Sequence, residues 1–248
     1  MKIVLNPQYD YLKAFINELP TFFSNKGDVI YSGRNTIKIY NTEGVAVSVK
    51  SFKCPILVNQ VVYSFFRKSK AERSYEYGTK LIEKGYNTPA PIAYIENKKA
   101  GLFKDSYYVS IYEEFDGMMR ELQTGVIEDR EDLLTQFAQY TANLHNDKVL
   151  HLDYSPGNIL YKKNGNIYTF YLVDLNRMEF DKPVDVDAGC KNFSRLWGSD
   201  DMITFIVKIY AKVRGFDEKI CLEKTFKYRE EFWIPFMERH PDATPYIG

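Results

Sequence analysis

The sequence predicts an α+β protein with a smaller strand-rich lobe followed by a larger, mainly helical lobe. Residues 28–52, DVIYSGRNTIKIYNTEGVAVSVKSF, alternate apolar and polar side chains around two turn sequences, which is typical of an antiparallel meander. From residue 192 onward apolar residues recur at helical spacing instead. The pattern changes after residues 113–117, EEFDG, where we expect the two lobes to join.

The composition is that of a folded globular protein with no excess of charge of either sign. The chain has 248 residues, of which 45% are hydrophobic and 27% charged, as in a folded globular protein. Lys+Arg and Asp+Glu balance at 33 each, so no overall field draws the chain to nucleic acid or a membrane. Cys54, Cys190 and Cys221 show no paired spacing, which favours a reducing compartment over a disulfide framework or zinc site. With no signal peptide or membrane-spanning segment recognisable, the sequence predicts a cytoplasmic protein.

The elements follow in order along the chain. In the first half we expect a helix over residues 9–19 that ends at Pro20, the meander, a helix over 69–85, and strands over 88–96 and 106–115. The helix over 69–85 should bury one face that comprises Ala71, Tyr75, Gly78 and Ile82.

The second half begins with an amphipathic helix over residues 130–148, with Leu133, Phe137, Tyr140 and Leu144 at helical spacing. Near its end, His145 is expected to pack or to cap the helix as an imidazolium. Residues 165–177 should form two short strands, and helices should dominate the remainder.

Polar residues that could take part in catalysis occur at three places in the sequence. The stretch 149–161, VLHLDYSPGNILY, places His151, Asp153 and Asn158 in a loop between two buried segments. Lys50 follows the alternating VAVSV strand, and Asp174 ends the hydrophobic strand FYLV. A strand Lys, an H-x-D-x-x-x-x-N loop and a strand-end Asp, in this order, resemble the motifs of protein-kinase-like phosphotransferases.

Longer segments of the sequence make the resemblance more specific. SGRNTIKIY, VKSFK, KAERSYEYGTKLIEKGYNTPAPIAYIE and HLDYSPGNILY…LVDLNR are similar to the lipopolysaccharide kinases that phosphorylate Kdo or heptose of the lipid A inner core. The resemblance covers residues 28 to about 195. It implies a kinase-like fold with an N-terminal lobe over 1–112, a hinge over 113–117 and a C-terminal lobe over 118–248, with ATP and Mg²⁺ as cofactors.

The resemblance also implies roles. Lys50 would bind the α- and β-phosphates, Asn158 and Asp174 would hold Mg²⁺, and Asp153 would orient the acceptor hydroxyl and take its proton. His151 is expected to brace the loop. A lone H-x-D triplet is more often a structural turn, so the weight rests on the motifs occurring together.

The nucleotide-binding half departs from the protein-kinase pattern. Gly33 stands alone where three glycines are usual, so Arg34 and Asn35 are expected to supply side-chain contacts to phosphate. The backbone of Glu113 and Glu114 would contact adenine. The acidic partner of Lys50 is expected to be Glu72, with Glu76 as the other candidate.

The second half departs as well. Ser155 occupies a position where many protein kinases have Lys, and the strand-end motif reads Asp-Leu-Asn. These departures disfavour a protein substrate and control by activation-loop phosphorylation. The basic residues Arg67, Lys68, Lys70 and Arg73 either contact a membrane or are the solvated start of a helix.

The expected function is therefore an ATP-dependent transferase that phosphorylates Kdo or heptose in lipopolysaccharide biosynthesis. The acceptor would be the lipid A–core glycolipid at the cytoplasmic face of the inner membrane, with peripheral membrane contact through the basic residues and no nucleic acid. Two other classes stay open: an atypical Ser/Thr or small-molecule kinase, and a non-catalytic pseudokinase scaffold.

Overall fold

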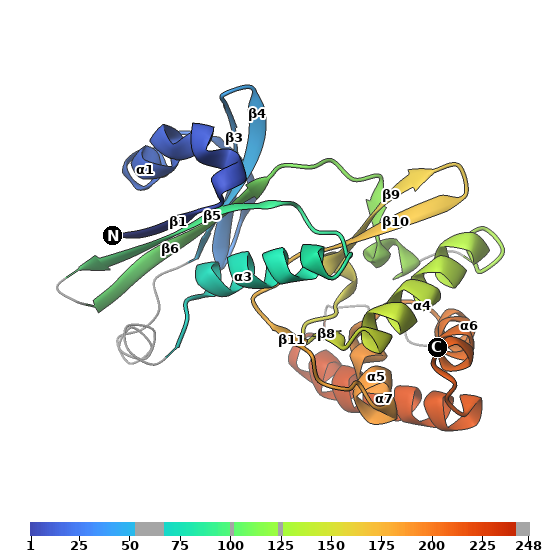
Figure 1. Cartoon of the computed structure of the whole chain (residues 1–248). Helices are drawn as coiled ribbons and strands as arrows, with labels where there is room; N and C mark the ends of the chain where they lie inside the picture. The colour runs from blue at the N-terminus through green and yellow to red at the C-terminus, as the bar shows by residue number, and fades with distance from the viewer. Residues whose placement is uncertain (53–66, 100–101, 124–125, 242–248) are drawn as a thin grey trace. The chain divides into compact units, whose positions relative to one another are not determined.

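The computed structural model describes residues 1–52, 67–99, 102–123 and 126–241. The chain divides into two compact units, Met1–Glu114 and Phe115–Gly248 (Figure 1). Cys54 lies outside the described residues, whereas Cys190 and Cys221 are buried free thiols. In the described segments no helix combines the length and apolarity needed to cross a membrane.

Unit 1 is built on a six-stranded sheet in the order β1-β5-β6-β4-β3-β2, and all its neighbouring strands run antiparallel. The strands are β1 (Lys2–Leu5), β2 (Asp28–Ser32), β3 (Asn35–Thr42), β4 (Val45–Phe52), β5 (Pro91–Lys99) and β6 (Leu102–Ile111). The meander predicted over residues 28–52 is confirmed as β2, β3 and β4.

Helices cover both faces of this sheet (Figure 1). The 3-10 helix η1 (Pro7–Leu12) and α1 (Lys13–Phe22) pack on the face that includes Val47 and Val49, both fully buried. On the other face α3 (Lys70–Glu83) packs against Phe52 and Tyr94. Because side chains alternate along a strand, Lys50 lies on the same face as Phe52, the face covered by α3.

Two expectations for unit 1 need correction. The first helix does not end at Pro20 but continues through it to Phe22. Pro20 removes one backbone donor near the end of the helix, and the burial of Ile16 and Leu19 holds the helix on the sheet. In α3, Ala71 and Gly78 are buried as predicted and Tyr75 packs against the core, but Ile82 is 43% exposed and Leu81 is fully buried in its place.

Unit 2 contains α4 (Glu131–Asn146), α5 (Val186–Asn192), α6 (Asp200–Arg214) and α7 (Glu218–Arg239), with the 3-10 helices η2 (Met119–Gln123), η3 (Pro156–Asn158) and η4 (Phe193–Arg195). Its strands are β7 (Gly117–Met118), β8 (Val149–His151), β9 (Ile159–Asn164), β10 (Ile167–Leu172) and β11 (Met178–Phe180). They form a three-stranded sheet, β10-β9-β7, and a two-stranded pair, β11-β8.

The strands of unit 2 differ from the prediction in one place. Residues 165–177 hold one strand, β10, rather than two, and its hairpin partner β9 comes from the end of the polar loop. The turn between them contains Gly165 at a φ of 59°, a left-handed conformation that glycine adopts without strain.

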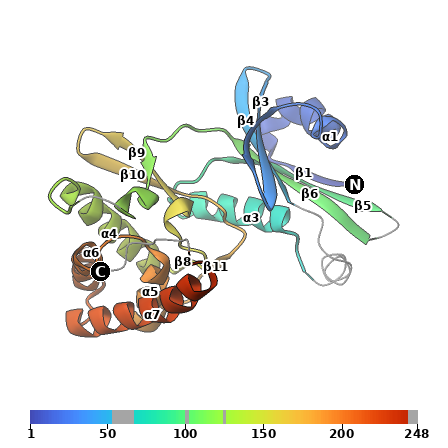
Figure 2. The ribbon, with the colours of Figure 1, turned by 180° about the vertical axis from the view of Figure 1, so that it is seen from behind.

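Helix α4 leads into the candidate site. Leu133, Phe137 and Leu144 are buried as predicted, and α4 packs against α6. Strand β8 begins three residues after α4 ends, so the well-packed helix fixes where the polar loop starts (Figure 2).

Candidate active site

The polar loop of unit 2 connects β8 to β9 and is closed by its own backbone. The Ser155 N–H donates to the Asp153 carbonyl at 2.7 Å, and the Asn158 N–H donates to the Ser155 carbonyl at 2.9 Å. Pro156 opens the short helix η3, where its missing N–H costs no hydrogen bond. The Ser-Pro-Gly-Asn sequence therefore forms a compact turn that separates Asp153 from Asn158 by a fixed distance.

His151 ties this turn to the segment that precedes Asp174. Its Nε2 lies 3.0 Å from the Val173 carbonyl, which can only accept, so Nε2 carries the proton. Its Nδ1 then accepts from the Asp153 N–H at 3.1 Å. Burial lowers the pKa of His151, which keeps the ring neutral and its hydrogen bonds fixed. His151 therefore braces the loop.

Asn158 and Asp174 are brought together by the backbone. The Val173 N–H donates to the Asn158 carbonyl at 3.0 Å, which places Asp174 beside Asn158. The Asn158 side-chain NH₂ donates to the Asp153 carbonyl at 2.9 Å, so its amide oxygen is oriented by that bond. Asp174 has a φ of 57°, in the left-handed region, and accepts from the Asn176 amide at 2.6 Å. An amide oxygen and a carboxylate are both hard ligands of the kind Mg²⁺ prefers.

The Asp153 carboxylate lies between two arginines that the sequence did not indicate. Arg195 Nη1 donates to Oδ1, and Arg177 Nη1 lies 3.7 Å from Oδ2. Arg177 falls within the LVDLNR phrase, but Arg195 is 42 residues from Asp153 in the sequence. A local motif therefore gave no signal for Arg195.

A buried chain of hydrogen bonds connects the loop to α6. The Asn192 NH₂ donates to the His151 carbonyl at 2.9 Å, so the Asn192 amide oxygen faces His145 Nε2 at 3.1 Å. His145 Nε2 must then donate this hydrogen bond. The other ring nitrogen, Nδ1, accepts from the Tyr210 hydroxyl at 2.9 Å. Burial lowers the pKa of His145 to about 3. Of the two expected roles, packing is therefore confirmed: His145 is a neutral link in the interior and not an imidazolium cap.

In unit 1, Lys50 lies on a central strand between Ile37 of β3 and Tyr108 of β6. Its Nζ lies 5.4 Å from the centre of the Phe52 ring. Gly33 and Arg34 form the turn between β2 and β3, which the Gly33 N–H closes by donating to the Asn35 carbonyl at 3.0 Å.

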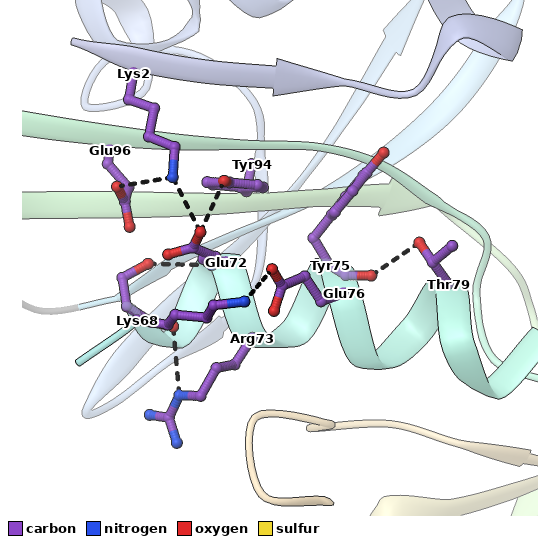
Figure 3. A network of polar contacts seen from close by, with 10 residues as sticks. Lys2, Lys68, Glu72, Arg73, Tyr75, Glu76, Thr79, Tyr94 and Glu96 are labelled. Carbon is purple, nitrogen blue, oxygen red and sulfur yellow. Dashed lines mark hydrogen bonds and ion pairs between the residues drawn. The ribbon is translucent and has the colours of Figure 1, made fainter. Parts of the chain in front are cut away.

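The predicted partner of Lys50, Glu72, takes part in a network between α3 and the strands β1 and β5 (Figure 3). Its Oε1 accepts from Lys2 Nζ at 2.9 Å and from the Tyr94 hydroxyl at 3.1 Å. Although partial burial opposes it, hydrogen bonding to Tyr94 and Glu72 raises the pKa of Lys2. Glu76 instead binds Lys68 at 2.5 Å. Pairing of Glu72 with Lys50 stays a prediction, and it would have to coexist with these contacts.

Two other groups of predicted residues lie at the end of unit 1 and around the start of α3. Glu113 and Glu114 end unit 1 just after β6. Among the basic residues, Lys68 is paired with Glu76 and Arg73 is only 9% exposed. The four cations from Arg67 to Arg73 therefore do not form a single exposed patch.

Comparisons with known proteins show what the chain is similar to. A family model described as the lipopolysaccharide kinase (Kdo/WaaP) family matches residues 32–207, well over half of the chain. A solved structure of WaaP in complex with acyl carrier protein has a TM-score of 0.61 at 15% identity, covering 98% of each chain. A MAP kinase from Leishmania major has a TM-score of 0.43 at 14% identity, covering 87% of this chain and 66% of that one. No curated protein sequence matches.

Proposed function

Because the chain belongs to the lipopolysaccharide kinase (Kdo/WaaP) family, we propose that it transfers the γ-phosphoryl group of ATP to a sugar hydroxyl, of Kdo or heptose, in the lipid A–inner core. The family makes the chain a kinase with a kinase-like fold. The acceptor sugar and the roles of individual residues are the further content of the proposal.

The observation that supports it best is the bonded arrangement of the loop in unit 2. Asp153, Asn158 and Asp174 are joined through two hydrogen bonds, from the Asn158 amide to the Asp153 carbonyl and from the Val173 N–H to the Asn158 carbonyl. A scaffold with no reaction to perform would not need a carboxylate, an amide and a second carboxylate held in one rigid unit. Phosphoryl transfer needs such positioned groups.

Asp153 would act on the acceptor. Its carboxylate would accept a hydrogen bond from the sugar hydroxyl, direct the hydroxyl oxygen toward the γ-phosphorus, and take the proton late in the transfer. The neutral ring of His151 and the Asn158 amide would hold the backbone of Asp153 in place for this role. Ser155 leaves the turn without the lysine found there in many protein kinases, which supports a non-protein acceptor.

Asn158 and Asp174 would hold Mg²⁺. When bound, Mg²⁺ would supply positive charge that neutralises the phosphates of ATP. The positions of the Asn158 amide oxygen and the Asp174 carboxylate fit this use, because both are hard oxygen ligands fixed by neighbouring backbone bonds.

Unit 1 would bind the nucleotide. Lys50 would pair with the α- and β-phosphates and Glu72 would orient it, while Gly33, Arg34 and Asn35 would border the phosphates. The backbone of Glu113 and Glu114 would contact adenine. The site of action would be the cytoplasmic face of the inner membrane.

The proposal is tested by transfer of labelled γ-phosphate from Mg-ATP to a panel of acceptors. The panel contains a lipid A–core precursor with Kdo alone, one with Kdo and heptose, a generic protein and an aminoglycoside. We expect label on one glycolipid only, lost in Asp153→Ala and retained in the exposed control Glu223→Gln. Because the solved WaaP structure contains acyl carrier protein, each reaction is run with and without that protein. Label on the protein or aminoglycoside alone would refute the sugar acceptor.

A further inference from the structure

Two guanidinium groups surround the carboxylate of Asp153. Arg195 donates to one oxygen, and Arg177 lies 3.7 Å from the other. In the described ranges, no other carboxylate lies within 4.0 Å of either arginine. Two positive charges thus face the one negative charge of Asp153.

Arg195 is held in place from α7 rather than lying loosely on the surface. Its guanidinium lies 5.0 Å from the centre of the Phe232 ring, which orients the planar group by stacking. The carbonyl of the next residue, Leu196, accepts from Arg229 Nη1 at 2.6 Å, and Arg229 is 2% exposed. Both the backbone and the head group of Arg195 are therefore fixed before any ligand arrives.

The arginines have donors that Asp153 does not use. Within the described residues Arg195 donates to protein through Nη1 alone, although a guanidinium offers five N–H groups. Its side chain is 36% exposed, and that of Arg177 is 54% exposed. A planar fork with exposed donors matches the paired oxygens of a carboxylate or phosphate.

The contact with Arg195 has a chemical cost. Carboxylate lone pairs that accept from arginine are not available to a sugar hydroxyl, so Asp153 as it lies here is partly occupied. An anionic group that binds the arginines would release these lone pairs at the moment when the acceptor is present.

We propose that Arg195 and Arg177 form an anion-binding subsite beside Asp153, and that the acceptor carries a carboxylate or phosphate near the hydroxyl that is phosphorylated. The acceptor anion takes the place of Asp153 on Arg195, and the freed carboxylate then receives the hydroxyl. This inference rests on the proposed function, since it assumes that Asp153 receives the acceptor hydroxyl.

Binding of small sugars tests the subsite without any turnover. The probes are the methyl glycoside of Kdo, which carries a carboxylate, and its methyl ester, which does not, together with glucose 6-phosphate and glucose. Each is titrated into the full chain by ligand-observed NMR. At least one anion should bind roughly tenfold more tightly than its neutral partner, and the pair that differs identifies carboxylate or phosphate as the group recognised. Equal affinity within both pairs overturns the proposal.

Variants separate a binding subsite from a structural clamp. Arg195→Gln should bring the anion and its neutral partner to equal affinity, and Arg177→Gln, on a more exposed side chain, should reduce the difference in part. The control Arg239→Gln, at the exposed end of α7, should keep the full difference in affinity between the anion and its neutral partner. Asp153→Asn should act in the opposite direction and tighten anion binding several-fold, because it removes the competing carboxylate. Weaker anion binding in Asp153→Asn, or equal weakening of anion and neutral sugar in both Arg195→Gln and Arg177→Gln, contradicts the subsite.

The two proposals fail in different ways. If the transfer assay labels no glycolipid but the anions still bind through Arg195, the proposed function fails and the subsite remains. If glycolipid is labelled but acid and ester bind equally, the function remains and the subsite is refuted.

Discussion

Mild acid should destabilise unit 2 through His145, the neutral link between α6 and the polar loop. The ring is buried, and burial lowers its pKa to about 3 in the folded protein. In the unfolded chain a histidine titrates near pH 6.5, at roughly the ordinary value. Between these two pH values the unfolded state therefore binds a proton that the folded state refuses, and stability falls as the pH falls.

The size of the effect follows from the difference in pKa. Each pH unit below 6.5 removes about 1.4 kcal/mol of unfolding free energy, so His145 should cost about 2 kcal/mol at pH 5. The pKa of His151 is also lowered by burial, so His151 contributes in the same direction. The variant His145→Gln retains one acceptor and one donor but cannot titrate. Its unfolding free energy should therefore fall about 2 kcal/mol less than that of the wild type between pH 7 and pH 5.

The measurement is urea unfolding followed by tryptophan fluorescence at pH 5, 6 and 7. The only two tryptophans, Trp197 and Trp233, lie in unit 2 and report on it alone. His240→Gln, at the exposed end of α7, is the matched control and should keep the wild-type pH dependence. Equal pH dependence in the wild type and His145→Gln would refute the neutral, buried role of His145.

Three further predictions concern the loop and its support. Asp153→Asn should leave ATP binding unchanged by calorimetry while turnover falls roughly 10²–10⁴-fold, as when a positioned base is lost; parallel loss of both would make Asp153 structural. Asp174→Ala should abolish Mg²⁺-dependent turnover, and wild-type activity in this variant would contradict the assignment of Asp174 as a metal ligand. Gly189→Ala should lower the unfolding free energy by about 1–3 kcal/mol, because the new methyl group would collide with the Tyr210 hydroxyl that bonds His145; unchanged thermal unfolding would argue against this close packing.

Features encoded within a few residues could be predicted from the sequence. The alternation over residues 28–52 predicts β2, β3 and β4, and the helix expected over 69–85 is found as α3. The resemblance that rested on the Lys50, Asp153 and Asp174 motifs is confirmed by the family match. These features need only local spacing, which is why the sequence shows them.

Contacts between distant residues could not be predicted. Lys2 and Glu72 are 70 residues apart, and Tyr210 and His145 are 65 apart. Neither pair has a local signature, because each depends on which helix face meets which strand or helix. The same reason explains the failure at Pro20: helix propensity predicts a stop there, but burial of the neighbouring Leu19 decides in favour of the helix.

The central claim is that the Asp153 loop directs phosphate from ATP to a sugar of the lipid A core. The most direct measurement is mass spectrometry of a lipid A–core precursor that lacks core phosphate, incubated with Mg-ATP and either the wild type or Asp153→Ala. We expect the glycolipid to gain one phosphate, with fragmentation placing it on Kdo or heptose, only with the wild type. A glycolipid of unchanged mass, or one phosphorylated equally by both proteins, would contradict the claim.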